Sequence, residues 1–451
     1  MPKITVYITN KNYSDFLEKS INSVLKQNFK DFELIIVDDG STDDSQTKIE
    51  KYRYLKNVRI FYRKSQGLIK TINFCIKASK GDFILRLDAD DFLDENALMI
   101  LYNAITKSKD TALVYSDYYT VDKKDRLINL NRNIDLKKHS KLFDIPAHGA
   151  CSLIRKECLE DVGLYDSSVD RQDGFDIWFK FVEKYKIRNI NIPLFYYRQH
   201  DKNLTKNQKN LLKVRAKLTK KFVNQKKIKI KKTIAIVIPV RGKQYDNNCM
   251  SQEKLKNKKL IHYTIEQAFK CKFKKKIIVT TSDTDLIKNI KKSYKNKINI
   301  HRRDKKLSFE NVDYKTANIQ AIKKFFKKKP DIIVILSFEN PYRESFYIEK
   351  AVNTMILNKT KSVISVQKDM QNKYFTYGRN GLKSLTNNNE LILERKSLYK
   401  ASGGISVFAY KDYLKKSNKT SYMSGHIMID DRSSFNIKSS LDLKIAEKNL
   451  I

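Results

Sequence analysis

Short, continuous apolar runs alternate with amphipathic segments along most of this 451-residue chain. The first runs, ITVYIT at residues 4–9 and ELIIV at residues 33–37, have the length of strands. Between them, apolar side chains recur with the spacing of one helical face, at Leu17, Ile21, Val24 and Leu25. Continuous apolar strands joined by such helices are typical of parallel sheets that are covered on both faces. The pattern therefore predicts an α/β fold.

The same pattern starts again in the second half of the chain. Further apolar runs lie at residues 233–239, 276–280, 331–336 and 362–366. At roughly 100–200 residues per domain, this indicates two α/β domains in tandem, at residues 1–205 and 232–451. The intervening residues 206–231 are almost entirely basic and apolar, without Gly or Pro. We expect them to form a basic helical linker that packs on the first domain; the alternative is an amphipathic helix that contacts anionic lipid.

The chain is strongly basic. Lys and Arg number 91 against 50 Asp and Glu, which gives a net charge of +41. The excess is expected either from A/T-biased codons, since Asn and Ile are also abundant, or from an anionic partner such as a membrane surface or a phosphorylated substrate. The basic residues are widely spread, without interleaved aromatics or zinc-ligand spacing, so we expect no specific nucleic-acid partner.

Cysteine usage and hydropathy indicate the compartment. Five cysteines form no CxxC pair, which fits a reducing environment. The N-terminal residues read as a strand rather than a signal peptide, and no apolar run approaches the ~20 residues that span a membrane. We therefore expect a cytoplasmic protein, with peripheral contact at the inner face of the membrane as the alternative placement.

Two acidic clusters follow expected strands of the first domain. They are DDGSTD at residues 38–43 and DADD at residues 88–91. Ligands of open α/β sheets bind at the carboxyl ends of strands, and Mg²⁺ or Mn²⁺ binds between carboxylates and substrate phosphates. One such cluster alone is as readily a solvated turn. Two of them at successive strand ends predict a site for Mn²⁺ or Mg²⁺ together with a diphosphate.

Several motifs in the same order make residues 3–205 resemble the family 2 glycosyltransferases of the GT-A fold. They are VDDGSTDDS at 37–45, KASKGDFILRLDADDFLDENAL at 77–98, GACSLIRKECLEDVGLYD at 149–166, QDGFDIWFKF at 172–181 and YYRQH at 196–200. The resemblance implies a nucleotide-sugar donor. It assigns nucleotide binding to Thr9, Asp38, Asp39 and Asp88, and metal binding to Asp90 and Asp91.

The resemblance also implies how the reaction proceeds. Asp173 matches the family's catalytic base, which takes a proton from the acceptor hydroxyl; the alternative is an exposed turn residue. His200 either completes the metal shell or is a hydrogen-bonded surface histidine. The family's usual outcome is direct displacement with inversion at the anomeric carbon. The acceptor would be a surface glycan, a lipid-linked sugar or a protein.

Residues 232–451 resemble the acylneuraminate (CMP-sialic acid type) cytidylyltransferases. Matching stretches include IAIVIPVRG at 234–242, KKLIHYTIEQAF at 258–269, KKIIVTTSDTDLI at 275–287 and DIIVILSFENPYR at 331–343. The two resemblances together imply two tandem Rossmann-like nucleotide-binding domains, a GT-A domain followed by a cytidylyltransferase-like domain.

The cytidylyltransferase motifs are incomplete. The cradle for the nucleotide phosphates keeps Arg241 and Gly242, but its Lys-Asn pair falls on Met250-Ser251. The family's metal-binding Asp-Ile-Asp reads Asn436-Ile437-Lys438, where a lysine would repel the ion. We therefore expect a glycosyltransferase with an inactive cytidylyltransferase-like domain, which would be a structural or regulatory module, bind a CMP-sugar without making it, or pair two chains in a homodimer. The alternatives are a bifunctional glycosyltransferase and CMP-nonulosonic acid cytidylyltransferase, or a non-enzymatic scaffold.

Overall fold

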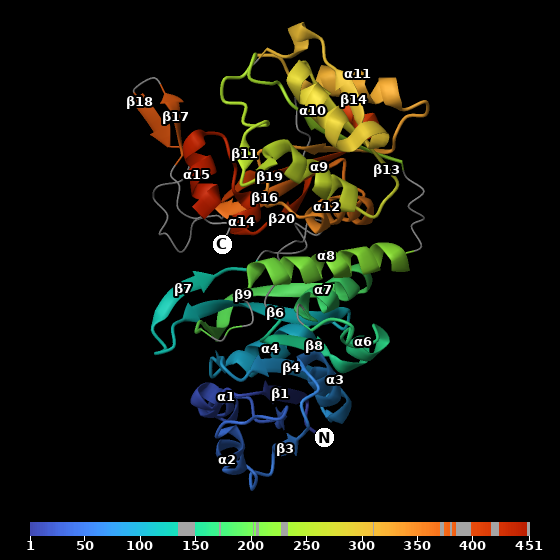
Figure 1. The fold of residues 1–451 in the computed structure, drawn as a ribbon. Helices are drawn as coiled ribbons and strands as arrows, with labels where there is room; N and C mark the ends of the chain where they lie inside the picture. Colours follow the sequence, from blue (N-terminus) through green and yellow to red (C-terminus); the bar gives the residue numbers. More distant parts are fainter. Residues whose placement is uncertain are drawn as a thin grey trace. The chain divides into compact units, whose positions relative to one another are not determined.

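The chain divides into two compact units (Figure 1), residues 1–207 with 373–396, and residues 208–372 with 397–451. The computed structural model describes residues 1–133, 149–170, 173–201, 203, 207–226, 233–309, 311–369, 374–378, 381–384, 398–415 and 424–448. Each unit has hydrophobic clusters of its own. The α/β expectation is confirmed in both.

The first unit is built on one mixed sheet with the strand order β3-β2-β1-β4-β8-β6-β9-β5, and β7 pairs with β6. Its parallel part consists of β1 (Ile4–Asn10), β2 (Phe32–Asp38), β3 (Val58–Tyr62) and β4 (Phe83–Asp88). The remaining strands are β5 (Phe92–Leu93), β6 (Thr111–Val121), β7 (Leu127–Asn131), β8 (Ser152–Arg155) and β9 (Lys186–Arg198). In the parallel register Thr9 lies opposite both Val37 and Asp88, so the acidic clusters after β2 and β4 flank the end of β1.

Helices cover both faces of this sheet. On one face β1 packs against α1 (Ser14–Leu25) and α4 (Ala97–Thr106). On the other face lie α3 (Leu68–Ala78), α6 (Lys156–Asp161) and α7 (Asp173–Lys184). The short α2 (Ser45–Glu50) follows the first acidic cluster. All seven residues of β1 are buried, which explains why its sequence is a continuous apolar run rather than an alternating one.

The second unit has a seven-stranded sheet with the order β14-β13-β10-β15-β19-β16-β20. Its parallel strands are β10 (Ile234–Pro239), β13 (Lys275–Thr281), β14 (Asn299–Arg302) and β15 (Ile332–Leu336). Strand β19 (Leu398–Ala409) runs antiparallel to β15 and β16 (Ser362–Asp369), and β20 (Ser424–Met428) pairs with β16. A small hairpin of this unit is formed by β11 (Lys254–Leu255) with β12 (Lys258–Lys259), whereas the hairpin of β17 (Phe375–Gly378) with β18 (Gly381–Ser384) groups with the first unit.

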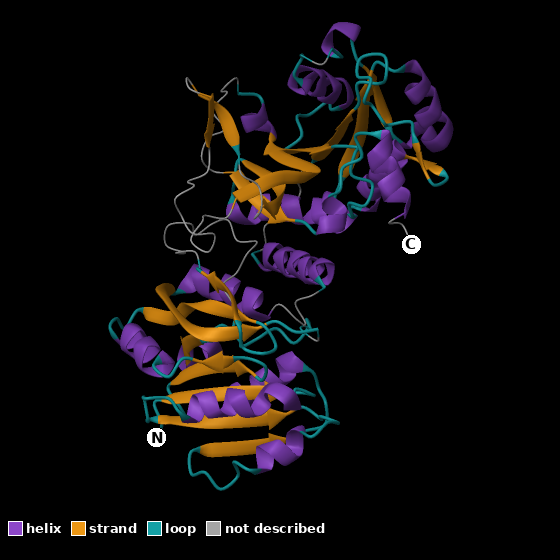
Figure 2. Cartoon of the chain, turned by 90° about the vertical axis from the view of Figure 1, so that its left-hand side faces the viewer, coloured by secondary structure: helices purple, strands orange, loops and turns teal. Residues whose placement is uncertain are grey.

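Helices also pack beside the strands of this second sheet (Figure 2). They are α9 (Leu260–Lys270), α10 (Thr284–Tyr294), α11 (Tyr314–Phe325), α12 (Ser345–Asn358), α13 (Tyr410–Tyr413), α14 (Asp431–Ser434) and α15 (Ser440–Lys448). Short 3₁₀ turns lie at Lys295–Lys297 and Lys305–Leu307. As in the first unit, loops at the carboxyl ends of the parallel strands connect to these helices.

The basic segment between the two series of strands forms helix α8 (Gln208–Gln225). Its packing differs from our expectation, because α8 groups with the second unit and packs against α12. Lys209 pairs with Glu344, and Lys220 Nζ lies 3.6 Å from Glu349 Oε2. Its apolar side chains, which the lipid alternative would use, are buried at Leu212, Leu218 and Phe222. Within the described residues, no helix has both the length and the apolar character needed to cross a lipid bilayer.

All five cysteines are free thiols, and all are buried. They are Cys75, Cys151, Cys158, Cys249 and Cys271. Burial raises the pKa of Cys75, Cys151 and Cys271 to about 12. These thiols therefore behave as small core residues.

Candidate functional site

Asp38, the last residue of β2, joins the ends of two parallel strands. Its carboxylate is fully buried and accepts hydrogen bonds from Asn10 Nδ2 at 2.9 Å and from the Ser41 backbone N–H at 3.0 Å. Gln46 Nε2 adds a third at 3.2 Å. A buried carboxylate requires such donors. Asp38 therefore holds the loop after β2 against the end of β1.

Asp39 fixes the segment that precedes α3. Its carboxylate accepts the backbone N–H groups of Gln66 and Gly67, both at 2.9 Å, and the Thr71 hydroxyl at 3.0 Å. Gly67 has a φ of +90°, which favours glycine at this turn into the helix. In this structure both Asp38 and Asp39 act as anchors of the surrounding loops. Their contact with a nucleotide, and that of the neighbouring Thr9, stays a prediction.

The second acidic cluster lies in the turn between β4 and β5. Asp88 Oδ1 accepts a hydrogen bond from Arg86 Nε at 2.6 Å. Asp90 Oδ2 lies 2.9 Å from His200 Nε2, although 110 positions separate the two residues in the sequence. Asp90 and His200 are only 8% and 9% exposed, so the pair is held inside the fold. The structure thus brings together two of the residues to which the sequence assigned metal binding.

Aromatic rings enclose His200. The Phe16 ring centroid lies 4.9 Å from that of His200, and the Tyr13 ring meets it edge-on at 5.6 Å. Both rings come from the start of α1 and the loop before it. His200 is therefore not a surface histidine. Its ring is packed on the same side of the sheet as α1 and directed at Asp90.

Negative charge is concentrated around this pair. Burial raises the pKa of the Asp91 carboxyl well above its usual range, and the charges of Asp90 and Asp88 raise it further. Asp91 Oδ1 accepts the Arg198 backbone N–H at 2.9 Å, whereas its buried Oδ2 has no hydrogen-bond partner among the described residues. Burial and the same three carboxylates also raise the pKa of Tyr13. A divalent cation would relieve this repulsion.

The donor set fits a cation that takes few ligands from the protein. Among the described residues, no cluster of three or more His, Cys, Asp or Glu side chains has metal-binding geometry. Neighbouring ligands of an octahedral ion at ~2.1 Å lie ~3 Å apart, which is close to the 2.9 Å between Asp90 Oδ2 and His200 Nε2. Mg²⁺ and similar ions commonly take the rest of their shell from substrate phosphates and water.

Arg198 is a site residue that the sequence reasoning missed. Its guanidinium is 2% exposed, donates from Nε to the Asp90 carbonyl oxygen at 2.8 Å, and pairs with Asp125. It also lies 4.8 Å from the Phe16 ring centroid. Arg198 thus contacts Asp90, the partner of His200, as well as Asp125. The available signal was an arginine at the end of an aromatic strand, two positions before His200 in YYRQH.

Asp173, the expected catalytic base, begins helix α7, but its side chain lies outside the described residues. One turn later Asp176 is fully buried and was not singled out from the sequence. Asp176 Oδ2 accepts Lys180 Nζ at 2.7 Å and the Asp166 backbone N–H at 3.0 Å. Asp176 therefore ties α7 to the preceding loop.

In the second unit, Arg241 and Gly242 follow β10 as expected. Gly242 has a φ of +91°, and a Cβ there would lie 2.7 Å from Asp283 Cβ, so the position requires glycine. Arg241 Nη2 donates to the Val312 carbonyl oxygen at 2.9 Å, and the guanidinium lies 4.3 Å from the Tyr314 ring centroid. The loop after β10 is thereby fixed against the start of α11.

Arg303 lies close to the same tyrosine and was not found from the sequence. It follows β14, is 2% exposed and donates from Nη2 to the Thr280 carbonyl oxygen at 2.9 Å. Its buried Nε and Nη1 have no hydrogen-bond partner among the described residues. Burial lowers the pKa of Arg303 to about 10. Arg241 and Arg303 therefore place two cations beside Tyr314, an arrangement suited to an anion.

The residues that stand in place of the expected cytidylyltransferase motifs contact other parts of the second unit. Met250 is buried in a cluster with Leu255, Leu260 and Ile437. Asn436 is hydrogen-bonded to Asn340, and the Lys438 backbone N–H donates to Asp442 Oδ2 at 3.0 Å.

Two further residues of this region hold the fold together. Asp430 caps α14 by accepting the Ser433 backbone N–H at 3.0 Å, and it also accepts the Tyr347 hydroxyl. Arg343 is fully buried, with hydrogen bonds to the carbonyl oxygens of Gly403 and Gly404. These side chains are therefore already committed to partners within the unit.

Comparison with known families gives the class of each half. Residues 5–163 match the model of Glycosyl transferase family 2, and residues 251–437 match the model of Cytidylyltransferase. The chain thus carries a family 2 glycosyltransferase domain followed by a cytidylyltransferase domain, as the sequence motifs indicated. Relatives of the first domain include proteins named glycosyltransferase and chondroitin synthase.

An uncharacterized glycosyltransferase of Rickettsia typhi is 28% identical over 244 residues, which cover 51% of this chain and 76% of the relative. The chondroitin synthase of Escherichia coli is 26% identical over 192 residues, covering 42% of this chain but only 28% of that protein. Among solved structures, Staphylococcus aureus TarS 1–349 with UDP-GlcNAc is 18% identical, with a TM-score of 0.40 over 49% of this chain and 67% of TarS 1–349. The mannosyltransferase PcManGT of Pyrobaculum calidifontis, solved with GDP-Man and Mn²⁺, is 14% identical, with a TM-score of 0.38 over 50% and 64% of the two chains.

Proposed function

We propose that the first unit is a metal-dependent, inverting glycosyltransferase that moves a sugar from a nucleotide-diphosphate sugar to a surface-glycan acceptor. The observation that carries the proposal is the Asp90–His200 contact of 2.9 Å beside Asp88 and Asp91, at the carboxyl edge of the parallel strands. The family 2 match over residues 5–163 supports it independently. A site with several carboxylates and one imidazole suits a cation and a diphosphate.

We assign metal binding and nucleotide binding to different residues of the site. Asp90 and His200 would hold Mn²⁺ or Mg²⁺, which supplies positive charge to the departing nucleoside diphosphate. Asp91 would support the pair from within the fold, and Asp88 would lie near the ribose and diphosphate. The end of β1 and the loop after β2, with Thr9, Asp38 and Asp39, would form the wall next to the nucleotide.

The acceptor side of the site is assigned to helix α7. Asp173 at its first position would accept the proton from the acceptor hydroxyl as that oxygen attacks the anomeric carbon. Attack from the face opposite the leaving diphosphate inverts the anomeric configuration. The acceptor is a glycan, a lipid-linked sugar or a protein. We propose that the protein lies at the cytoplasmic side of an anionic membrane. This localisation rests on the net charge of +41 alone.

The test follows donor turnover rather than sugar transfer, so it does not require the acceptor. Purified protein is incubated with Mn²⁺ and a panel of nucleotide-sugars, and the released nucleotide is measured. Asp173→Asn should lower turnover of the preferred donor by ~10²–10⁴-fold, the usual contribution of a positioned acid or base. Asp82→Asn, which changes an exposed carboxylate of the same unit (70% exposed side chain), should have no effect.

A second measurement tests the metal site without relying on catalysis. Binding of Mn²⁺ alone, followed by electron paramagnetic resonance, should be weakened in Asp90→Asn and in His200→Gln but retained in Asp173→Asn. Unchanged Mn²⁺ affinity in the first two variants would contradict the proposed ligands. Full donor turnover by Asp173→Asn would contradict the proposed base.

For the second unit we propose loss of nucleotidyl transfer, because Met250 is packed in a core and Asn436 and Lys438 replace the expected carboxylates. The alternative, a bifunctional chain, is favoured by Arg241 and Arg303 beside Tyr314. Pyrophosphate release from CTP with a nonulosonic acid decides between them, and we expect none.

A homodimer formed through this unit is part of the same proposal, and a monomer mass by light scattering would contradict it.

A further inference from the structure

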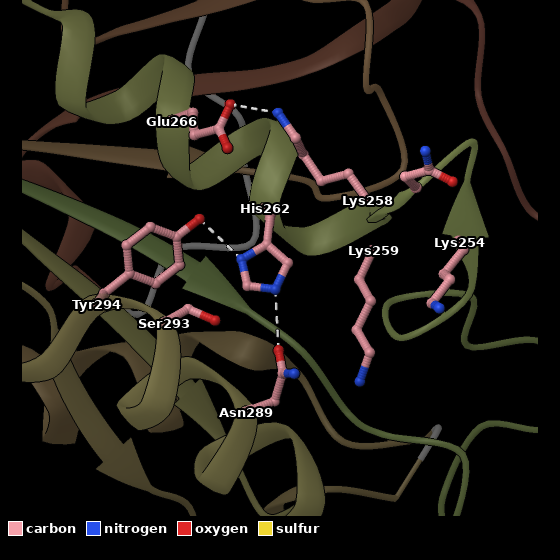
Figure 3. Close-up of a pocket in the computed structure, with 9 residues that line it drawn as sticks. Lys254, Lys258, Lys259, His262, Glu266, Asn289, Ser293 and Tyr294 are labelled. Carbon is pink, nitrogen blue, oxygen red and sulfur yellow. Dashed lines mark hydrogen bonds and ion pairs between the residues drawn. The ribbon is translucent and has the colours of Figure 1, made fainter.

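A pocket of about 430 Å³ lies in the second unit, between the β11–β12 hairpin, the start of α9 and the end of α10 (Figure 3). Its volume is within the range of ~300–1,000 Å³ typical of small-molecule sites. Its lining is almost entirely polar, with Lys254, Lys258 and Lys259 on one side and Asn289 and Tyr294 on the other. None of the residues that surround Arg241 and Arg303 line it.

His262 forms a fixed, uncharged wall of the pocket. Its Nε2 lies 2.9 Å from Asn289 Oδ1, an arrangement that suits the tautomer with the proton on Nε2. Its Nδ1 then accepts the Tyr294 hydroxyl, at 2.7 Å. Burial lowers the pKa of His262, which favours this neutral form. Because Asn289 uses its oxygen for His262, its amide nitrogen is left to face the pocket, as Figure 3 shows.

Three lysines supply most of the remaining charge of the lining, beside the carboxylate of Glu266 and the polar side chains of Asn257 and Ser293. Lys258 Nζ pairs with Glu266 Oε2 at 2.7 Å, which neutralises the carboxylate of the lining. Lys259 Nζ donates one hydrogen bond to Gln252 Oε1 at 3.2 Å and has two further hydrogens. Lys254 adds an exposed ammonium group. Two ammonium groups and one amide nitrogen thus border the same space, whereas the only carboxylate is already paired. Such a lining disfavours cations and apolar ligands.

From this geometry we infer that the pocket is an oxyanion site that binds the phosphoryl group of a small ligand. A phosphoryl group has three acceptor oxygens and a charge of about −1.5 to −2 near neutral pH, which matches the two ammonium groups and the amide donor. The site is separate from the glycosyltransferase centre and does not depend on the function proposed for it. The phosphoryl group could come from a soluble phosphate or from a lipid headgroup, which share this chemistry.

The experiment uses the full-length protein and inorganic phosphate as the probe, with binding measured by isothermal titration calorimetry. In the double variant Lys254→Gln/Lys259→Gln we expect phosphate affinity to fall about tenfold or more. The control is Lys328→Gln/Lys329→Gln, which removes the same charge from an exposed loop of the same unit and should leave the affinity unchanged. Equal losses in both double variants would overturn the inference, because they would indicate a general charge effect.

A second variant leaves every lysine in place. Asn289→Asp keeps an acceptor for His262 Nε2 but replaces the amide donor with a carboxylate oxygen, so it should also weaken phosphate binding at least tenfold. Unchanged affinity in this variant would overturn the inference. Co-sedimentation with phosphatidylcholine vesicles, with and without phosphatidic acid, identifies the source. Pocket-dependent binding to the acidic vesicles indicates a lipid headgroup, and phosphate binding without it indicates a soluble ligand.

Discussion

At the scale of single residues, buried arginines organise both candidate sites. Arg198 contacts the backbone of Asp90, the carboxylate of Asp91 through its own N–H, and Asp125. Arg303 is equally buried, yet two of its donors have no partner among the described residues. An arginine whose donors are used positions its neighbours, whereas one with spare donors can bind a ligand.

Arg198→Lys is the sharpest single-residue test of this distinction. Lysine keeps the charge but cannot bridge the Asp90 carbonyl and Asp125 together, so one of these acceptors loses its donor. We expect the free energy of unfolding of the first unit to fall by ~2–4 kcal/mol and Mn²⁺ affinity to fall several-fold. Urea unfolding and Mn²⁺ titration measure the two effects.

Asp125→Asn is the matched control for this substitution. It removes the charge of one partner but leaves both links from Arg198 to the acidic turn in place. Mn²⁺ affinity should therefore change less than in Arg198→Lys. Equal effects of the two variants on Mn²⁺ affinity would contradict a positioning role of Arg198 that runs through the Asp90 carbonyl.

The sequence predicted some of these residues and not others, for a physical reason. The clusters at residues 38–43 and 88–91 could be found because carboxylates at strand ends have a local signature. Asp176 and Arg303 could not, because their roles depend on partners that only the tertiary fold supplies. His200 was left open for the same reason, and its contact with Asp90 removes the surface alternative.

At the scale of elements, strand β4 enters the sheet under a tight steric constraint. Gly81 lies just before it and donates its N–H to Thr5 Oγ1 at 2.9 Å. A Cβ at this position would lie 2.5 Å from the Thr5 backbone nitrogen. Neither backbone can move without disturbing the pairing of β1 with β4. Glycine is therefore required by close approach rather than by a left-handed conformation.

Gly81→Ala should lower the free energy of unfolding by about 3 kcal/mol, at the upper end of the usual cost of overpacking. Gly163→Ala is the comparison, because that position has a φ of +78° but no atom within 4 Å of an added Cβ. It should cost only the ~1–2 kcal/mol of the left-handed conformation. Chemical denaturation of both variants gives the two values, and a smaller loss for Gly81→Ala would contradict the steric argument.

The parallel strands were predictable at this scale, but their antiparallel neighbours were not. Runs such as residues 34–37 and 234–238 are continuously apolar, because both of their faces are covered. The positions of β6, β8 and β9 depend on pairing between distant segments, which hydrophobic periodicity does not encode. The packing of α8 was misjudged similarly, since its apolar face alone does not identify α12 as the partner.

At the scale of the whole molecule, the two units have separate cores and one unit carries the only tryptophan. Trp178 packs in a cluster made entirely of first-unit residues. Tryptophan fluorescence therefore reports on the first unit, whereas far-ultraviolet circular dichroism reports on both. We expect the two signals to give urea unfolding curves with different midpoints. If the two curves coincide at every protein concentration tested, the units unfold as one cooperative body.

The burial of all five cysteines has a practical consequence for labelling chemistry. A thiol must ionise and meet its reagent before it is alkylated, and burial opposes both steps at Cys75, Cys151 and Cys271. While the protein is folded, maleimides should leave its native thiols largely unmodified. One cysteine introduced at an exposed position would then be the preferred target, so a fluorophore or spin label can be attached to either unit without first removing the natural cysteines.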